Sequence, residues 1–292
     1  MSEHEQAPPG VDPRIPSPAR MYDLFLGGTE HYAADRQAAA RLREHMPDLE
    51  DAAWANRGFL QRAVRHLADH GIRQFLDIGS GLPTRTNTHE VARSRRPDTH
   101  VVYVDNDPAV KAHATALLAA EASADGACRR NAGEPGTDGP RTAFLPGDLR
   151  RPQEILDREI TRRTLDLGEP VALLVVAVTH FVSDEDDPWG KVRYVLDRLA
   201  PGSYLALAAA TSDNQAPRTL NAIDEVYSSS TADAYLRSRA EIARFFDGLE
   251  LLPPYPGAEP SITYLGLWGA DDPEAADDDG SRWGYCGVAR RP

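Results

Sequence analysis

Cysteine is scarce in this chain, and long apolar runs are absent from it. The two cysteines, Cys128 and Cys286, lie far apart and form neither a disulfide framework nor a metal-ligand pattern, which is typical of a reducing cytoplasm. The longest apolar run, residues 171–178, is much shorter than the roughly 20 residues that span a bilayer. The N-terminus is polar and proline-rich, without the basic and apolar regions of a signal peptide. We therefore expect a cytoplasmic protein with no membrane partner.

Basic charge is also in deficit. The chain holds 32 Lys and Arg against 45 Asp and Glu, a formal net charge of -13. Binding to a nucleic-acid backbone requires a concentrated basic surface, which this balance disfavours. We expect a small-molecule partner rather than nucleic acid. The composition leaves the oligomeric state open.

The pattern along the chain divides it into three parts. Residues 1–18 are rich in proline and lack periodicity, which predicts a flexible tail. Residues 19–71 have helical periodicity, with Leu60, Val64 and Leu67 forming one apolar stripe and Gly71 ending the last helix. Residues 72–292 begin with regular alternation of strands and helices. We expect a tail, an N-terminal helical lid or cap, and a ligand-binding domain.

The alternation predicts the fold class. Strands are expected within residues 72–78, 99–108, 141–149, 171–182 and 203–211, and helices fill the intervals between them. Such a series forms a mostly parallel sheet with helices on both faces, an α/β Rossmann-like architecture. Later strands are expected near residues 249–254 and 283–291. Ligands of such sheets bind beyond the carboxyl ends of the strands.

The turn after the first strand lacks a third glycine. In "QFLDIGSGLPTRT", Gly79 and Gly81 follow the strand directly, but Pro83 replaces the continuation that dinucleotide sites use. Acidic residues stand at three successive strand ends, namely Asp77, Asp105 and Asp148. Three carboxylates would repel a pyrophosphate. They suit a ligand with a ribose, an amine and a positive centre, and S-adenosylmethionine is such a ligand.

Several stretches carry a resemblance to a known family. "FLDIGSGLPT", "VVYVDNDPAV", "GDLRRPQEIL", "VALLVVAVTHFVSDEDDP" and "LAPGSYLALA" resemble the successive motifs of class I S-adenosylmethionine-dependent methyltransferases. "ARMYDLFLGGTEHYAADR" (residues 19–36) further resembles the N-terminal element of an actinobacterial S-adenosyl methyltransferase family, once a domain of unknown function. The resemblance implies a seven-stranded, mostly parallel sheet with an N-terminal helical lid. His31 and Tyr32 stand where that family usually has Asn and Phe, and the loop at residues 259–273 also departs from its pattern.

These motifs predict the residues that contact the cofactor S-adenosylmethionine. Asp77 is expected near its ammonium group, Asp105 at its ribose, and Asp148 at its adenine amino group. Asn56 and Arg57 are candidates for its carboxylate, with an exposed helix face as the alternative. The full set expected at the cofactor is Asp77, Gly79, Ser80, Gly81, Asp105, Asn106, Asp148, Leu149, Val178 and Thr179.

Methyl transfer needs alignment and exclusion of water more than a catalytic dyad. His180, at the end of the most apolar strand, is the candidate general base, and a structural histidine is the equal alternative.

The lid or substrate candidates are Tyr22, Gly28, His31, Tyr32, Asn56 and Arg57, and the weaker acceptor-side candidates are Tyr235, Arg237 and Arg239. His180 with Asp184, Asp186 and Asp187 could hold a metal, but a solvated acidic loop is favoured, so no metal is predicted.

Three functions remain on the sequence alone. The first is methyl transfer from S-adenosylmethionine to an unidentified small molecule. The second is a non-catalytic regulatory module that binds S-adenosylmethionine or its demethylated product, S-adenosylhomocysteine. The third, an NAD-dependent oxidoreductase, suits the sheet but not the glycine spacing.

Overall fold

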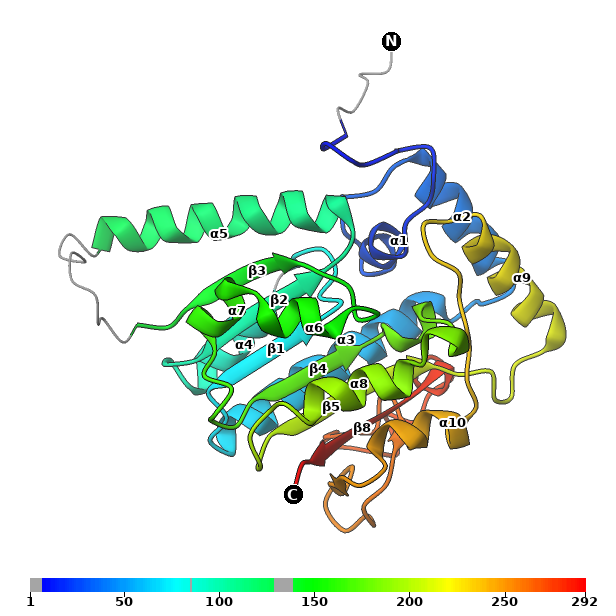
Figure 1. Ribbon diagram of the computed structural model, residues 1–292. Coiled ribbons are helices and arrows are strands. Elements are labelled where there is room, and N and C mark those ends of the chain that lie inside the picture. The colour runs from blue at the N-terminus through cyan, green and yellow to red at the C-terminus, as the bar shows by residue number, and fades with distance from the viewer. Residues whose placement is uncertain (1–6, 85, 129–138) are drawn as a thin grey trace.

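The computed structural model describes residues 7–84, 86–128 and 139–292, so the first six residues of the predicted tail lie outside the described residues. At its centre is one sheet, in the order β3-β2-β1-β4-β5-β8-β6, with β7 paired to β8 off this path (Figure 1). The strands are β1 (Gln74–Ile78), β2 (His100–Asp105), β3 (Thr142–Pro146), β4 (Ala172–Val176), β5 (Tyr204–Ala210), β6 (Glu250–Leu251), β7 (Thr263–Tyr264) and β8 (Gly284–Arg290).

The pairing confirms the predicted mostly parallel sheet. Strands β1 to β5 are parallel to their neighbours, whereas β8 runs antiparallel to β5 and β6 runs antiparallel to β8. The seven-strand path matches the expectation, and the two-residue β7 is an addition to it. Because β1 to β5 are parallel, their carboxyl ends share one edge of the sheet.

Helices and short 3-10 turns connect and cover the strands. The α-helices are α1 (Pro18–Phe25), α2 (Ala33–Arg43), α3 (Leu49–Asp69), α4 (Thr88–Arg95), α5 (Pro108–Cys128), α6 (Pro152–Asp157), α7 (Glu159–Thr164), α8 (Pro188–Leu196), α9 (Pro217–Ser228) and α10 (Arg239–Ala243). The 3-10 turns are η1 (Thr179–Phe181), η2 (Asp184–Asp186), η3 (Arg244–Phe246) and η4 (Ser281–Trp283). None of the helices in the described part of the chain has the length and apolar character needed to cross a bilayer.

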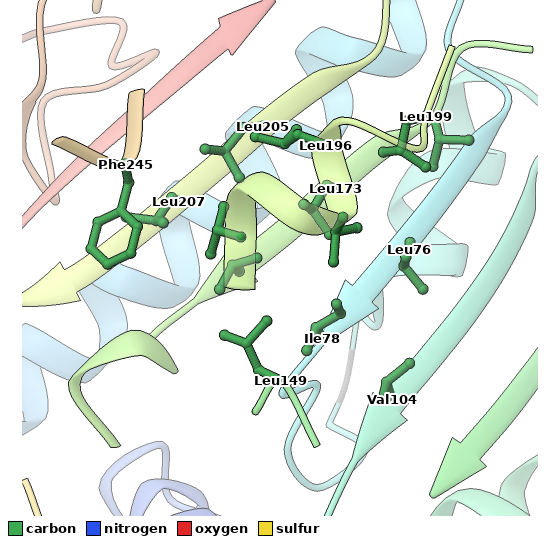
Figure 2. Packing of buried hydrophobic residues seen from close by; sticks show 14 of the residues in the cluster. Leu76, Ile78, Val104, Leu149, Leu173, Leu196, Leu199, Leu205, Leu207 and Phe245 are labelled. Atoms are coloured by element: carbon green, nitrogen blue, oxygen red, sulfur yellow. The ribbon is translucent and has the colours of Figure 1, made fainter. Parts of the chain in front are cut away.

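Alternation along each strand builds two separate cores. On β1, Leu76 and Ile78 face the layer of α6, α7 and α8, while Phe75 faces the layer of α3 and α4. Figure 2 shows Leu76, Ile78 and Leu173 packed together on the first face. Asp77 alternates to the second face, so its carboxyl points toward α3 and α4. The strand pattern thereby decides which helices can contact this acid.

Two elements differ from their predicted extents. The strand predicted over residues 171–182 ends at Val176, because Ala177 has a left-handed φ of 59° that turns the chain out of the sheet. The 3-10 turn η1 follows directly. The interval between the third and fourth expected strands holds two helices, α6 and α7, separated by Arg158 in an extended conformation.

The N-terminal region packs rather than trailing away. Helices α1, α2 and α9 gather beyond one end of the sheet (Figure 1), where their apolar side chains form a third cluster. Residues 10–17, here called the strap, run from Gly10 beside Pro108 to Ser17, whose hydroxyl donates to Asp107. The backbone carbonyl of Pro16 also accepts a hydrogen bond from the backbone N–H of Thr231. The flexible tail predicted for residues 1–18 is therefore wrong for the strap.

The strap ends in a buried ion pair at the start of α1. Arg20 donates to Asp35 at 2.9 Å, and both side chains are almost fully buried. Asp35 also accepts the backbone N–H groups of Ser17 and Tyr32. One carboxylate thus ties the strap, α1 and α2 together, which fixes the roof over the sheet edge.

Candidate active site

One cavity of about 740 Å³ lies at the carboxyl ends of the parallel strands. Its volume falls within the range of about 300–1,000 Å³ that is usual for small-molecule sites. The strap, helices α1 to α3 and α9 contribute its other walls. The sheet edge, the N-terminal helices and α9 therefore enclose a single chamber.

The turn after β1 forms part of the floor. Gly79 and Gly81 both have left-handed φ values, of 74° and 67°. The N–H groups of Gly79 and Ser80 donate to the carbonyl of Val104, which folds the turn against β2. A Cβ at Gly79 would lie 2.1 Å from Val178, whereas one at Gly81 would meet nothing within 4 Å. Gly79 is thus required by packing, and Gly81 leaves open space beside the cavity.

Asp77 and Asp105 are buried at the ends of β1 and β2. The hydroxyl of Thr88 donates to Asp77 at 2.7 Å, and the N–H groups of Gly81 and Asp107 each donate to Asp105 at 2.9 Å. Burial raises the pKa of each carboxyl to about 6, although these hydrogen bonds act in the opposite direction. Each carboxylate oxygen can accept a further bond from a ligand.

Asp148 follows β3 and is held by its neighbours. The guanidinium of Arg150 donates to it at 2.7 Å, and the amide of Asn106 donates at 3.1 Å. Burial tends to raise the pKa of Asp148, but the hydrogen bonds from Arg150 and Asn106 outweigh it and lower the pKa. Next to it, Leu149 is buried in the first core and also lines the cavity.

Helix α3 supplies a buried cation. Arg57 donates to the hydroxyl of Thr84 and, at 3.0 Å, to the carbonyl of Thr86, so it clamps the far side of the glycine turn. Its charge also favours the ionised form of Asp77 and lowers the pKa of that carboxyl, against the effect of burial. The preceding residue, Asn56, donates to the hydroxyl of Tyr22 at 2.8 Å. All three candidates from the N-terminal region, Tyr22, Asn56 and Arg57, line the cavity.

His180 lines the cavity from η1 rather than from a strand end. Its Nδ1 accepts the backbone N–H of Ala210 at 3.3 Å, and its ring lies 4.4 Å from that of Phe181. Burial, and secondarily the charge of Arg237, lower the pKa of His180 to about 3. An imidazole that resists protonation this strongly is a poor general base at neutral pH, so the geometry argues against the role expected from the sequence.

The cavity has two halves that differ in charge. The charged half comprises the strap, the ends of β1, β2 and β3, and Arg57, whereas the uncharged half lies over the ends of β4 and β5. Among the described residues that line the uncharged half, none is Asp, Glu, Lys or Arg. Its main side chains are Phe25, Leu42, Met46, Leu49, His180, Phe181, Ile223, Tyr227, Leu236 and Trp283.

Some predicted residues do not reach the cavity. Thr179 is fully buried behind it, and its carbonyl accepts from Arg237. Gly28 lies against Asp23, where a Cβ would clash at 2.1 Å. His31 contacts Arg36, and Tyr32 is the N-cap residue of α2. Gly28, His31 and Tyr32 share the segment between α1 and α2, which does not line the cavity, and Thr179 lies in η1, beyond the end of β4.

The acceptor-side and metal candidates also lie elsewhere. Arg237 is buried and donates to the carbonyl of Val182 and to Asp184, so it braces the loop after β4. Neither it nor Tyr235 nor Arg239 lines the cavity. Asp187 caps α8 by accepting the N–H of Gly190. Within the described ranges, no group of three or more His, Cys, Asp or Glu side chains is placed to hold a metal.

The residues that sequence reasoning missed come mainly from α9, η1 and the strap. Ile223 and Tyr227 enter from α9, a helix with no predicted counterpart, and Val11 and Ile15 enter from the strap. Only the spacing of apolar residues in 217–228 could have indicated the inward face of α9. Nothing local to the sequence shows that this helix packs on α2.

The sheet order and the strand-end site define a Rossmann-like class I methyltransferase fold. The chain belongs to the S-adenosyl methyltransferase family, whose model matches residues 4–292, and its cofactor is S-adenosylmethionine. A DUF574 family protein from Streptomyces avermitilis MA-4680 is 40% identical over 96% of this chain and 99% of its own, with a TM-score of 0.83. A candidate methyltransferase from Thermobifida fusca YX is 37% identical over 98% of this chain and 99% of its own, with a TM-score of 0.81. A search of curated proteins finds no match.

The residues present fit this cofactor. The carboxylate of Asp77 and the guanidinium of Arg57, both buried, provide the two signs of charge that an amino acid requires. The buried carboxylate of Asp105 provides acceptors for ribose hydroxyls, and Gly81 leaves open space beside them. The chain is thus an S-adenosylmethionine-dependent methyltransferase.

Proposed function

We propose that this methyltransferase acts on a small molecule that binds in the same cavity as the cofactor. The observation that carries the proposal is the division of one chamber of about 740 Å³ into a charged half and an uncharged half. The charged half suits the cofactor, and the uncharged half is left for an acceptor. Because both halves open into each other, two ligands bound there would be in contact.

The cofactor would occupy the charged half. Asp105 would accept the ribose hydroxyls, Asp77 the ammonium group, and Arg57 would bind the carboxylate, which planar guanidinium groups recognise well. Gly79, Ser80 and Gly81 would lie along its centre. Asn106, Asp148 and Leu149 would surround the adenine, and Val178 would contact the cofactor near the junction of the two halves.

When bound, S-adenosylmethionine supplies a methyl group activated by its sulfonium. The residues of the chain would align the acceptor with that methyl and exclude water. Enclosure by the strap, α1 and α9 favours a small acceptor over a polymer. The bond between Ser17 and Asp107 and the bond between Pro16 and Thr231 hold this roof on two sides.

Calorimetric titration tests the cofactor assignment. We expect S-adenosylmethionine and S-adenosylhomocysteine to bind, and NAD not to bind. Asp105→Ala should lower the affinity for both compounds by at least about tenfold. The substitution removes the carboxylate that the ligand would contact and leaves the N–H groups of Gly81 and Asp107 without their acceptor. Asp98→Ala is the matched control, since Asp98 is exposed and lies just before β2, at the opposite edge of the sheet. A folded protein that binds neither compound would overturn the proposal.

A further inference from the structure

The uncharged half contains two polar side-chain groups that the protein leaves unused. Within the described residues, neither Nε2 of His180 nor the hydroxyl of Tyr227 has a hydrogen-bond partner, although both residues line the cavity. His180 is 9% exposed and Tyr227 is half-buried, and neither free atom is among the fully buried unpaired atoms, so both are accessible from the cavity. The ring of Phe181 contacts both side chains, with its centroid 4.4 Å from that of His180 and 5.4 Å from that of Tyr227. Two polar groups that lack a protein partner and line an otherwise apolar chamber are placed to bind a polar atom of a ligand.

Both free groups are hydrogen-bond donors. Because Nδ1 of His180 accepts the N–H of Ala210, the proton of the neutral ring is on Nε2. Burial raises the pKa of Tyr227 to about 12, so its hydroxyl keeps its proton at neutral pH. Two donors in an otherwise apolar chamber are complementary to an oxygen that carries negative charge or develops it.

The surroundings of His180 disfavour proton abstraction by its imidazole. The groups that face its imidazole are the backbone N–H of Ala210, the ring of Phe181 and the charge of Arg237. No carboxylate among the described residues lining this half could orient a histidine base or attract an ammonium group. A hydroxyl nucleophile must therefore be acidic enough to lose its proton to water.

We propose that the acceptor is an uncharged, ring-bearing molecule with an acidic hydroxyl, a phenol or enol, whose oxyanion is bound by His180 Nε2–H and Tyr227 O–H. This proposal rests on the proposed function and specifies its acceptor. The hydroxyl proton goes to water before transfer; the oxygen–carbon bond then forms while the sulfur–carbon bond breaks, and its electron pair remains on sulfur. Aliphatic and aromatic walls such as Leu42, Met46 and Phe181 would hold the ring.

Binding to the protein saturated with S-adenosylhomocysteine tests the acceptor class. The probes are 1-naphthol, 1-naphthoic acid and 1-naphthylmethylamine, which have similar size but are neutral, anionic and cationic at neutral pH. We expect 1-naphthol to bind at least about tenfold more tightly than 1-naphthylmethylamine, because an unpaired cation in an apolar site is unfavourable. 1-Naphthoate should also bind, because its oxygen can accept from the two donors. Tighter binding of 1-naphthylmethylamine than of 1-naphthol, or no binding of 1-naphthol, would overturn the proposal. If S-adenosylhomocysteine itself fails to bind, the proposed function fails and this proposal with it.

Substitutions separate donation from proton abstraction. Tyr227→Phe and His180→Leu should each lower the affinity for 1-naphthol by up to about tenfold, the effect of one hydrogen bond. His180→Gln, which keeps an N–H donor but cannot act as a base, should retain affinity and methyl transfer close to the original. Tyr204→Phe is the matched control, because Tyr204 begins β5 at the edge of the sheet away from the cavity. Loss of transfer in His180→Gln with unchanged 1-naphthol binding would show that histidine is the base.

The pH profile provides a second, independent readout. Transfer to 1-naphthol and to the more acidic 4-chloro-1-naphthol should rise with pH, with a midpoint that is lower for the more acidic compound. A midpoint that is the same for both acceptors would instead report a group of the protein. That result would contradict entry of the acceptor as an oxyanion.

Discussion

The two halves of the cavity are built in different ways. In the charged half, each ionised group is already held by the protein: Asp77 by Thr88, Asp105 by two backbone N–H groups, and Asp148 by Arg150 and Asn106. In the uncharged half, the polar groups of His180 and Tyr227 that point to a ligand have no such support among the described residues. One half is thus preorganised by hydrogen bonds, and the other is shaped by apolar packing.

This difference indicates what each half can select. Fixed donors and acceptors recognise one ligand closely, because a misplaced partner leaves a buried polar group unsatisfied. Apolar walls discriminate weakly between similar shapes, at about 1–3 kcal/mol for one methylene. Met46 in the wall adds a flexible, adaptable side chain. We therefore expect strict recognition of the cofactor and a broader range of acceptors.

The largest expected effect is the loss of cofactor affinity when the charged half is acidified. Folding raises the pKa of Asp77 and Asp105 to about 6, above the ordinary 3.8, because both are buried. If both must be ionised to bind S-adenosylhomocysteine, its affinity should fall about a hundredfold between pH 7.5 and pH 5, about tenfold for each carboxyl. 5′-Methylthioadenosine lacks the amino acid, so its affinity should fall only about tenfold, through protonation of Asp105 alone. Calorimetry at both pH values measures this, and flat affinities would mean that both carboxyls stay ionised.

The same two carboxyls predict the opposite trend for the free protein. Their folded pKa is higher than their unfolded pKa, so the folded state binds protons more tightly. Their stabilising contribution is complete below about pH 4 and is lost as the pH rises through 6. The ligand-free protein should therefore gain stability from these groups in the range where it loses affinity for the cofactor.

Removal of the buried cation should have the next largest effect. Arg57→Gln should lower the affinity for S-adenosylhomocysteine by about thirtyfold, the loss expected for hydrogen bonds to a charged group. The same change should leave 5′-methylthioadenosine nearly unaffected, since that compound has no carboxylate to bind. Equal losses for both compounds would mean that Arg57 acts through the glycine turn, which it clamps at Thr84 and Thr86. Arg65→Gln, on the same helix but outside the cavity, is the matched control.

Much of the charged half could be predicted from the sequence, because it depends on strand ends. Asp77, Asp105 and Asp148 each follow a short apolar strand, and parallel strands bring their carboxyl ends together whatever the loops do. The cap that Asp187 forms on α8, directly before Pro188, likewise depends only on neighbours in the chain. In these cases, the residues that determine position are neighbours in the chain.

The uncharged half could not be predicted, because its parts meet only in the folded chain. Phe25, Ile223 and Trp283 share one apolar cluster but come from three distant segments. The strap was misjudged for the same reason: its prolines suggest disorder, and its order comes from Asp35, Asp107 and Thr231. The displaced position of His180 follows from one residue, Ala177, whose left-handed conformation no sequence rule indicated.

Adding a charge to the uncharged half should reduce the contrast between the halves. Ala234 lines this half and is only partly buried, so an introduced carboxylate can remain hydrated at its edge. We expect Ala234→Asp to lower the affinity for 1-naphthol and to raise the affinity for 1-naphthylmethylamine, each by about two- to fivefold, as for a partly exposed ion pair. Ala234→Asn, which has a similar size and no charge, is the matched control. Unchanged preference for the two probes would show that the acceptor does not reach this wall.

The smallest effect is expected at the strap, which borders the charged half. Ser17 both caps α1 and donates to Asp107, the residue that also donates its N–H to Asp105. Ser17→Ala should cost about 1 kcal/mol of local stability, as for loss of a helix cap. Because the strap has further anchors at Pro16 and Arg20, it should stay closed most of the time, and S-adenosylhomocysteine should dissociate only about two- to threefold faster in stopped-flow displacement. Binding of 1-naphthol should not change, and neither ligand should respond to the control Ser228→Ala, at the exposed end of α9. If Ser17→Ala also changed the dissociation rate of 1-naphthol, the strap would hold the acceptor as well as the cofactor. The division into two halves would then not extend to the roof of the cavity.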